Sequence, residues 1–140
     1  MQDFGERIGK LLTGEEVIEL VGDVGAGKTT FVRGLAKGMG VTETVQSPSF
    51  TISRLYDGVG GHRLAHYDFY RLADPGIMAQ ELADTIMTRD TTVIIEWADS
   101  ITAVLPDNKI RLSITTTAPT VRQVTIEATG ENNQRILEQL

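Results

Sequence analysis

The order of hydrophobic and polar residues divides this chain into short strands and helices. Residues 17–21 (VIELV) and 91–97 (TTVIIEW) are largely apolar and rich in β-branched side chains, and they predict two buried strands. Elsewhere apolar and polar residues alternate, which is the pattern of strands with one buried face. This alternation predicts two antiparallel hairpins, formed by residues 50–56 with 62–70 and by residues 109–116 with 121–128.

Other segments repeat apolar residues at helical spacing and predict amphipathic helices. These are residues 3–12, 30–39, 77–87 and 131–140, with a shorter helix at 99–105. In the second helix, Phe31, Leu35 and Met39 recur every four residues and share one face. Because helices separate the buried strands, the chain is expected to be an α/β protein with a central, mostly parallel sheet and antiparallel hairpin additions.

A glycine-rich stretch joins the first buried strand to the second helix. Residues 22–29 read G-x-x-x-x-G-K-T, the pattern of a phosphate-binding loop. Glycines let such a backbone approach a ligand closely, and its N–H groups then converge on phosphate oxygens. Lys28 is expected to contact the outer phosphates and to act in catalysis, and the Thr29 hydroxyl is expected to bind Mg²⁺. The fold expected is therefore a three-layer sandwich like that of the P-loop NTPases. The nucleotide-binding residues expected in the loop are Gly22, Asp23, Val24, Gly25, Ala26, Gly27, Lys28, Thr29 and Thr30.

The second buried strand ends in a carboxylate. If this strand lies parallel to the loop strand, Glu96 reaches the Mg²⁺ site as a second metal ligand. The alternative is an ordinary exposed carboxylate at a strand end. Trp97 belongs either to the core or to the cover of the nucleotide, and Asp99 is expected to cap the short helix close to the same site.

An aspartate interrupts the aromatic strand at 62–70. Side chains alternate along a strand, so His66, Asp68 and Tyr70 share one face. Asp68 is either a structural acceptor for His66, Arg71 or backbone donors, or a residue beside the γ-phosphate that positions water or metal. Composition alone favours the structural role. His66 is expected to be a hydrogen-bonded partner rather than a metal ligand.

Two serines follow the second helix in a polar loop. The hydroxyl of Ser47 or Ser49 could reach the metal at the γ-phosphate, as switch loops do in nucleotide hydrolases. Both could instead be turn residues that bond to their own backbone.

Composition limits the classes of function. The chain has 140 residues, of which 41% are hydrophobic and 23% charged, and a single domain over residues 1–140 is expected. It has no cysteine, no apolar run of about 18 residues and no signal peptide pattern, which predicts a cytoplasmic protein without a membrane partner. A formal net charge of −6 disfavours direct binding to DNA or RNA, so any nucleic-acid role should run through a partner or a local patch.

Motifs elsewhere help to choose the nucleotide. The D-x-x-G at residues 57–60 falls in a hairpin turn, and N-K-x-R at residues 108–111 has arginine where guanine recognition needs aspartate. The chain is therefore expected to use ATP with Mg²⁺ rather than GTP. Small-molecule kinases usually carry a lid with several arginines, whereas the arginines between residues 40 and 90 are scattered. This weakens the kinase interpretation without excluding it.

Four segments together resemble one family. Residues 22–31 (GDVGAGKTTF), 47–51 (SPSFT), 66–72 (HYDFYRL) and 95–99 (IEWAD), in this order, are similar to the TsaE (YjeE) ATPases of bacteria. Each segment by itself says little beyond the phosphate loop, but the four in order are specific.

The resemblance implies a role in tRNA modification. That family is needed to make N6-threonylcarbamoyladenosine at position 37 of ANN-reading tRNAs, and it acts with the transferase TsaD and its partner TsaB. It hydrolyses ATP weakly alone. By position, the resemblance implies phosphate contact for Lys28, Mg²⁺ ligation for Thr29 and Glu96, a switch-like role for Ser49, and a place near the nucleotide for Trp97. It also implies a place near the γ-phosphate for Asp68, which makes the catalytic role of Asp68 the favoured one. A small-molecule kinase and a nucleotide-gated module without hydrolysis remain alternatives.

Overall fold

The computed structural model describes residues 1–48, 51–70, 74 and 76–140. In this part of the chain six strands form one sheet in the order β2-β3-β4-β1-β5-β6. The strands are β1 (Val17–Gly22), β2 (Ser53–Asp57), β3 (Arg63–Asp68), β4 (Thr91–Glu96), β5 (Ile110–Ala118) and β6 (Val121–Ala128). The α-helices are α1 (Gln2–Gly9), α2 (Lys28–Gly38), α3 (Gly76–Ile86) and α4 (Glu131–Glu138), and two 3₁₀ helices are η1 (Val59–Gly61) and η2 (Ala98–Val104).

The two apolar runs form the middle of the sheet. β1 pairs in parallel with β4 on one side and with β5 on the other, and β3 pairs in parallel with β4. Every residue of β4 is buried, since helices cover both faces of the sheet there. The outer pairs, β2–β3 and β5–β6, are antiparallel. This confirms the expected sheet with its hairpin additions.

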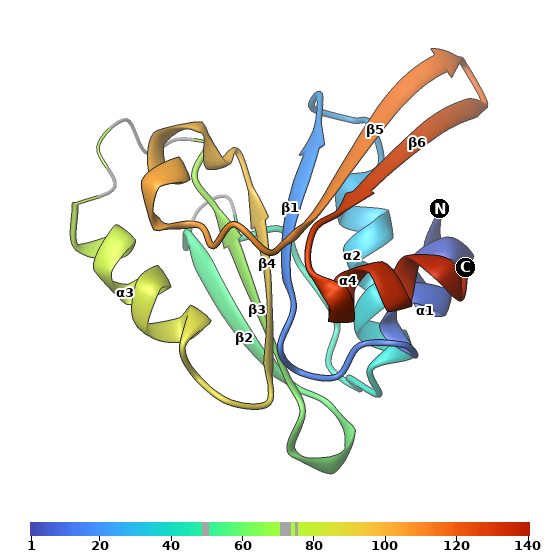
Figure 1. The fold of residues 1–140 in the computed structure, drawn as a ribbon. Helices are drawn as coiled ribbons and strands as arrows, with labels where there is room; N and C mark the ends of the chain where they lie inside the picture. The colour runs from blue at the N-terminus through green and yellow to red at the C-terminus, as the bar shows by residue number, and fades with distance from the viewer. Residues whose placement is uncertain (49–50, 71–73, 75) are drawn as a thin grey trace.

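Helices lie on both faces of the sheet (Figure 1). α1, α2 and α4 cover one face, where Phe31, Leu35 and Ile136 join the larger hydrophobic core. α3 and η2 cover the other face, where Leu82 and Ile101 pack in a second core. The molecule is therefore the expected three-layer α/β sandwich. No helix among the described residues is both long enough and apolar enough to cross a bilayer.

The first helix lies directly against α2 at a set of glycines. A Cβ atom at Gly5 or Gly9 would collide with the backbone of α2, and one at Gly34 or Gly38 would collide with the backbone of α1. Four glycines thus allow the two helix backbones to touch. The expected helix at 3–12 is real, but it begins and ends earlier than its pattern suggested.

Two local expectations were wrong. The first hairpin strand begins at Ser53 rather than at residue 50, because Thr51 and Ile52 form a turn in which Ile52 has a φ of 69°. Phe50 lies outside the described residues. Asp99 does not cap the short helix, since η2 begins one residue earlier with Trp97 at its N-cap and no side-chain cap.

Candidate functional site

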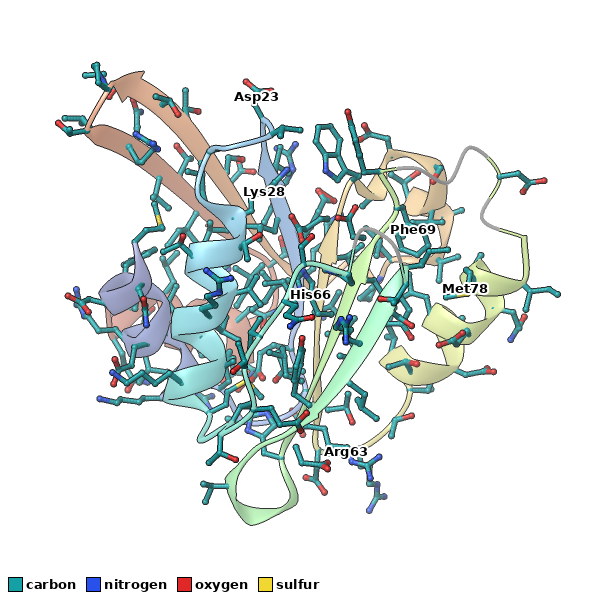
Figure 2. The ribbon with its side chains drawn as sticks, turned by 180° about the vertical axis from the view of Figure 1, so that it is seen from behind. Asp23, Lys28, Arg63, His66, Phe69 and Met78 are labelled. Atoms are coloured by element: carbon teal, nitrogen blue, oxygen red, sulfur yellow. The ribbon has the colours of Figure 1, made fainter. Side chains whose placement is uncertain are left out.

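The glycine-rich loop lies at the edge of the sheet where the parallel strands end. It connects β1 to α2, and Figure 2 shows Asp23 at its turn and Lys28 at the start of the helix. Gly25 and Gly27 have φ values of 82° and 106°, a region that favours glycine over residues with a side chain. The first turn of a helix leaves N–H groups without helical partners, so the loop and the start of α2 together have the geometry that suits an anion.

A cavity of about 400 Å³ opens beside this loop. It brings together most of the residues that the sequence selected. It is lined by Val24, Gly25, Gly27, Lys28, Thr29, Thr30, Ser47, Asp68, Tyr70, Glu96 and Trp97.

Some of the selected residues do not line this cavity. Gly22, Asp23 and Asp99 border a smaller neighbouring cavity of about 140 Å³. Ala26 is buried, and its carbonyl accepts a hydrogen bond from Arg122 Nε of β6 at 3.2 Å. Ser49, the switch-like candidate, lies outside the described residues.

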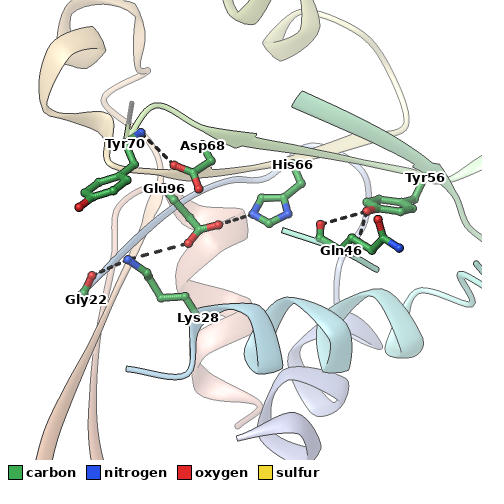
Figure 3. A network of polar contacts seen from close by, with 8 residues as sticks. All are labelled: Gly22, Lys28, Gln46, Tyr56, His66, Asp68, Tyr70 and Glu96. Carbon is green, nitrogen blue, oxygen red and sulfur yellow. Dashed lines mark hydrogen bonds and ion pairs between the residues drawn. The ribbon is translucent and has the colours of Figure 1, made fainter. Parts of the chain in front are cut away.

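Lys28 is held by three neighbours. Its Nζ donates to the carbonyl of Gly22 at 2.5 Å and lies 3.9 Å from Glu96 Oε1 (Figure 3). The same Nζ stands 4.2 Å from the centre of the Trp97 ring. Burial lowers the pKa of Lys28, while the nearby carboxylates of Glu96, Asp68 and Asp23 oppose that shift. Lys28 is thus a buried cation that lines the cavity.

Glu96 is a buried carboxylate at the end of β4. It is only 3% exposed, which rules out an ordinary exposed strand-end carboxylate. Because β4 lies beside β1 in parallel, Glu96 reaches the loop as expected. Its Oε2 lies 2.6 Å from Nε2 of His66, a partner that was expected to be hydrogen-bonded but was not assigned to Glu96.

Asp68 ends the neighbouring strand β3. Its Cα pairs with that of Glu96 across the two parallel strands, and Asp68 lines the cavity. Its Oδ1 also accepts the backbone N–H of Tyr70 at 2.9 Å. The two roles considered for Asp68 are therefore compatible, since one oxygen fixes the strand end and the carboxylate still faces the cavity. Arg71, another possible partner, lies outside the described residues.

Two aromatic residues form one wall of the cavity. Trp97 has the left-handed conformation, with a φ of 57°, which is rare for a bulky residue and turns the chain sharply after β4. Its ring packs against Tyr70 at 4.7 Å between centroids. Sequence reasoning placed Tyr70 on the face of Asp68 but did not select it, although that shared face was the available signal.

The described residues hold no group of three or more His, Asp or Glu side chains that could enclose a metal ion by themselves. A hydroxyl from Thr29 and a carboxylate from Glu96 line the same cavity. Hard oxygen donors of this kind suit Mg²⁺, which usually takes one or two protein ligands and completes its shell with phosphate oxygens and water.

The sheet order and the glycine loop between β1 and α2 define an α/β protein of the P-loop NTPase type. The model of the family described as "Threonylcarbamoyl adenosine biosynthesis protein TsaE" matches residues 1–124. This chain belongs to the TsaE family, which takes part in tRNA threonylcarbamoyladenosine biosynthesis.

Individual relatives agree with this assignment. The TsaE protein of Streptomyces coelicolor is 37% identical over 136 residues, covering 94% of this chain and 92% of the relative. That of Bacillus subtilis is also 37% identical, covering 89% and 77% of the two chains. The crystal structure of Bacillus subtilis YdiB is similar in fold, with a TM-score of 0.78, 30% identity, and coverage of 99% of this chain and 88% of that one.

Proposed function

We propose that this protein is an ATPase that acts in the biosynthesis of N6-threonylcarbamoyladenosine in tRNA. The observation that carries the proposal is the convergence of the glycine-rich loop, Asp68 and Glu96 on one cavity. A phosphate loop alone does not distinguish a hydrolase from a kinase. Buried carboxylates at two neighbouring strand ends add the groups that metal binding and water activation need.

Each residue has a definite task in this proposal. The loop N–H groups and Lys28 bind the phosphates of ATP, while Thr29 and Glu96 hold Mg²⁺. The metal ion, when bound, neutralises charge on the phosphates. Asp68 orients or deprotonates the attacking water, and Trp97 covers the nucleotide.

The charges around the cavity favour slow turnover by the protein alone. Among the described residues that line it, Lys28 is the single cation, and no arginine takes part. An arginine that reaches the transferring phosphoryl group accelerates hydrolysis by about 10³ to 10⁵ in P-loop enzymes. We therefore propose that TsaD and TsaB bind this protein in the cytoplasm and complete its site, with tRNA engaged through that complex.

Lys28→Ala tests the nucleotide site most simply. Titration calorimetry with ATP and Mg²⁺ should show binding to the wild type and its loss in Lys28→Ala, because the loop then lacks its phosphate-binding cation. Lys10→Ala is a matched control, since Lys10 is an exposed lysine directly after α1 that pairs with Glu6. Equal ATP affinity in Lys28→Ala and the wild type would contradict the assignment of the glycine-rich loop as the ATP site.

A further inference from the structure

The carboxylate of Glu96 has two oxygens with different neighbours. Oε1 faces Nζ of Lys28 at 3.9 Å, on the side of the phosphate loop. Oε2 lies 2.6 Å from Nε2 of His66, which comes from the middle of β3 and is 0% exposed (Figure 3). The two residues are thus joined by a short, buried hydrogen bond.

This bond fixes the direction of the carboxylate. A carboxylate in water rotates freely, whereas Glu96 is buried and anchored at one oxygen, so Oε1 is the oxygen directed at Lys28. With Nε2 as the donor, Oε2 accepts the imidazole N–H, and Oε1 remains a separate acceptor on the side of the loop. Hydrogen-bonded partners of this kind orient metal ligands, and their loss typically lowers metal affinity about 10- to 100-fold.

We propose that His66 is a positioning residue that holds Glu96 in the orientation needed to bind Mg²⁺. This inference rests on the proposed function, because it requires Mg²⁺–ATP to occupy the cavity. His66 does not line the cavity, so its effect passes through Glu96. Replacement of His66 should therefore weaken the binding of Mg²⁺ much more than it weakens the binding of the ATP phosphates to the loop.

The second histidine of the chain supplies a matched control. Nε2 of His62 lies 2.9 Å from Oγ1 of Thr92, near the beginning of β4. That position is at the opposite edge of the sheet from Glu96, which ends β4. Both histidines contact a residue of β4, but one of them alone contacts the proposed metal ligand.

The experiment measures ATP affinity by calorimetry at a series of Mg²⁺ concentrations, from excess EDTA to saturating Mg²⁺. His66→Leu removes the N–H donor, and His66→Asn has an amide that is one methylene too short to take the place of Nε2, whereas the longer His66→Gln can place an N–H there. We expect the first two variants to need about 10- to 100-fold more Mg²⁺ for half of the gain in affinity, with unchanged affinity in EDTA. His66→Gln should recover part of the loss, and His62→Leu should match the wild type.

The outcomes separate the inference from the proposed function. A wild type that binds no ATP would overturn the proposed function. A wild type whose ATP affinity responds to Mg²⁺, together with His66 variants that respond in the same way, would overturn the inference alone. Equal loss of affinity with and without Mg²⁺ would also overturn it, since a positioning role for the metal predicts a selective loss. Circular dichroism identifies an unfolded variant, and His66→Asn decides the question if His66→Leu fails to fold.

Discussion

At the scale of residues, Asp68 and Glu96 differ although they end neighbouring strands. Glu96 is engaged by Lys28 and His66, while Asp68 accepts the backbone N–H of Tyr70. Glu96 thus contacts the lysine of the glycine-rich pattern and lines the same cavity. Asp68 holds the backbone N–H of Tyr70 and lines the cavity, which is the position that a residue acting on water would need.

Substitution of Asp68 separates its two roles. Asp68→Asn keeps an oxygen for the Tyr70 N–H but removes the negative charge, and Asp68→Ala removes both. If Asp68 acts on water, both variants should lower kcat about 10²- to 10⁴-fold, the usual contribution of a general base, with little change in ATP affinity. Steady-state hydrolysis and calorimetry measure the two quantities. A normal rate in Asp68→Asn with a low rate in Asp68→Ala would instead indicate a structural residue.

The sequence predicted which residues line the cavity better than it predicted their contacts. The loop pattern selected Lys28 and Thr29, and the apolar run before Glu96 placed it at a buried strand end. The bond between His66 and Glu96 depends on the pairing of strands 30 residues apart. The bond between Arg122 and Ala26 joins residues 96 positions apart. Neither contact has a signal in local spacing, so each required the register of the sheet.

At the scale of elements, the contact of α1 with α2 depends on glycines. A methyl group at Gly34 would meet the backbone oxygen of Gln2, and backbone cannot move aside as a flexible side chain can. Glycine in a helix otherwise costs about 1 kcal/mol relative to alanine. Helix propensity and packing therefore predict opposite effects for the same substitution.

Gly34→Ala should lower the free energy of unfolding. Overpacking typically costs about 1–3 kcal/mol, and this exceeds the gain in helix propensity. Urea unfolding measures the effect. Lys37→Ala, on the exposed side of the same helix, loses an ion pair with Glu6 and should change stability by less than about 1 kcal/mol. A stabilised Gly34→Ala protein would mean that the two helices do not touch at this position.

Element boundaries were predicted best where a strand or helix has a regular buried face. The strand at 121–128 has the expected bounds, because its alternation continues to both ends. The strand expected from residue 50 starts late because of the turn at Thr51 and Ile52, and the helix expected at 99–105 is a 3₁₀ helix that starts at Ala98. In both places a residue with positive φ, Ile52 or Trp97, lies directly before the element. Isoleucine and tryptophan rarely adopt positive φ, so the sequence gives no sign of these turns.

At the scale of the whole molecule, a second polar network lies at the edge of the sheet opposite the proposed site. The carboxylate of Glu16 is 1% exposed and accepts hydrogen bonds from Thr13, Thr92 and Asn132. Burial acts to raise the pKa of Glu16, but the hydrogen bonds from Thr13, Asn132 and the backbone of Gly14 hold that pKa below its usual range. Burial lowers the pKa of the neighbouring His62, against the pull of nearby Glu16 and Asp90.

These shifts predict that acid destabilises the fold. Since the folded state resists protonation of His62, stability is highest above the ordinary histidine pKa of about 6.5 and falls as the pH drops below it. Glu16 adds a second loss below about pH 4.3. Urea unfolding between pH 7.5 and 5 should show a shallower pH dependence in His62→Gln than in the wild type. Identical slopes would show that His62 is not the group responsible.

The proposed function of the whole molecule is ATP hydrolysis in partnership with TsaD and TsaB. The most direct measurement is the rate of ADP release by this protein alone and with TsaB, TsaD and tRNA added. We expect slow release alone, stimulation when the partners are present, and no stimulation when Lys28→Ala replaces the wild type. ATP that binds without being hydrolysed, even when the partners are present, would contradict the proposed ATPase function and indicate a nucleotide-gated module.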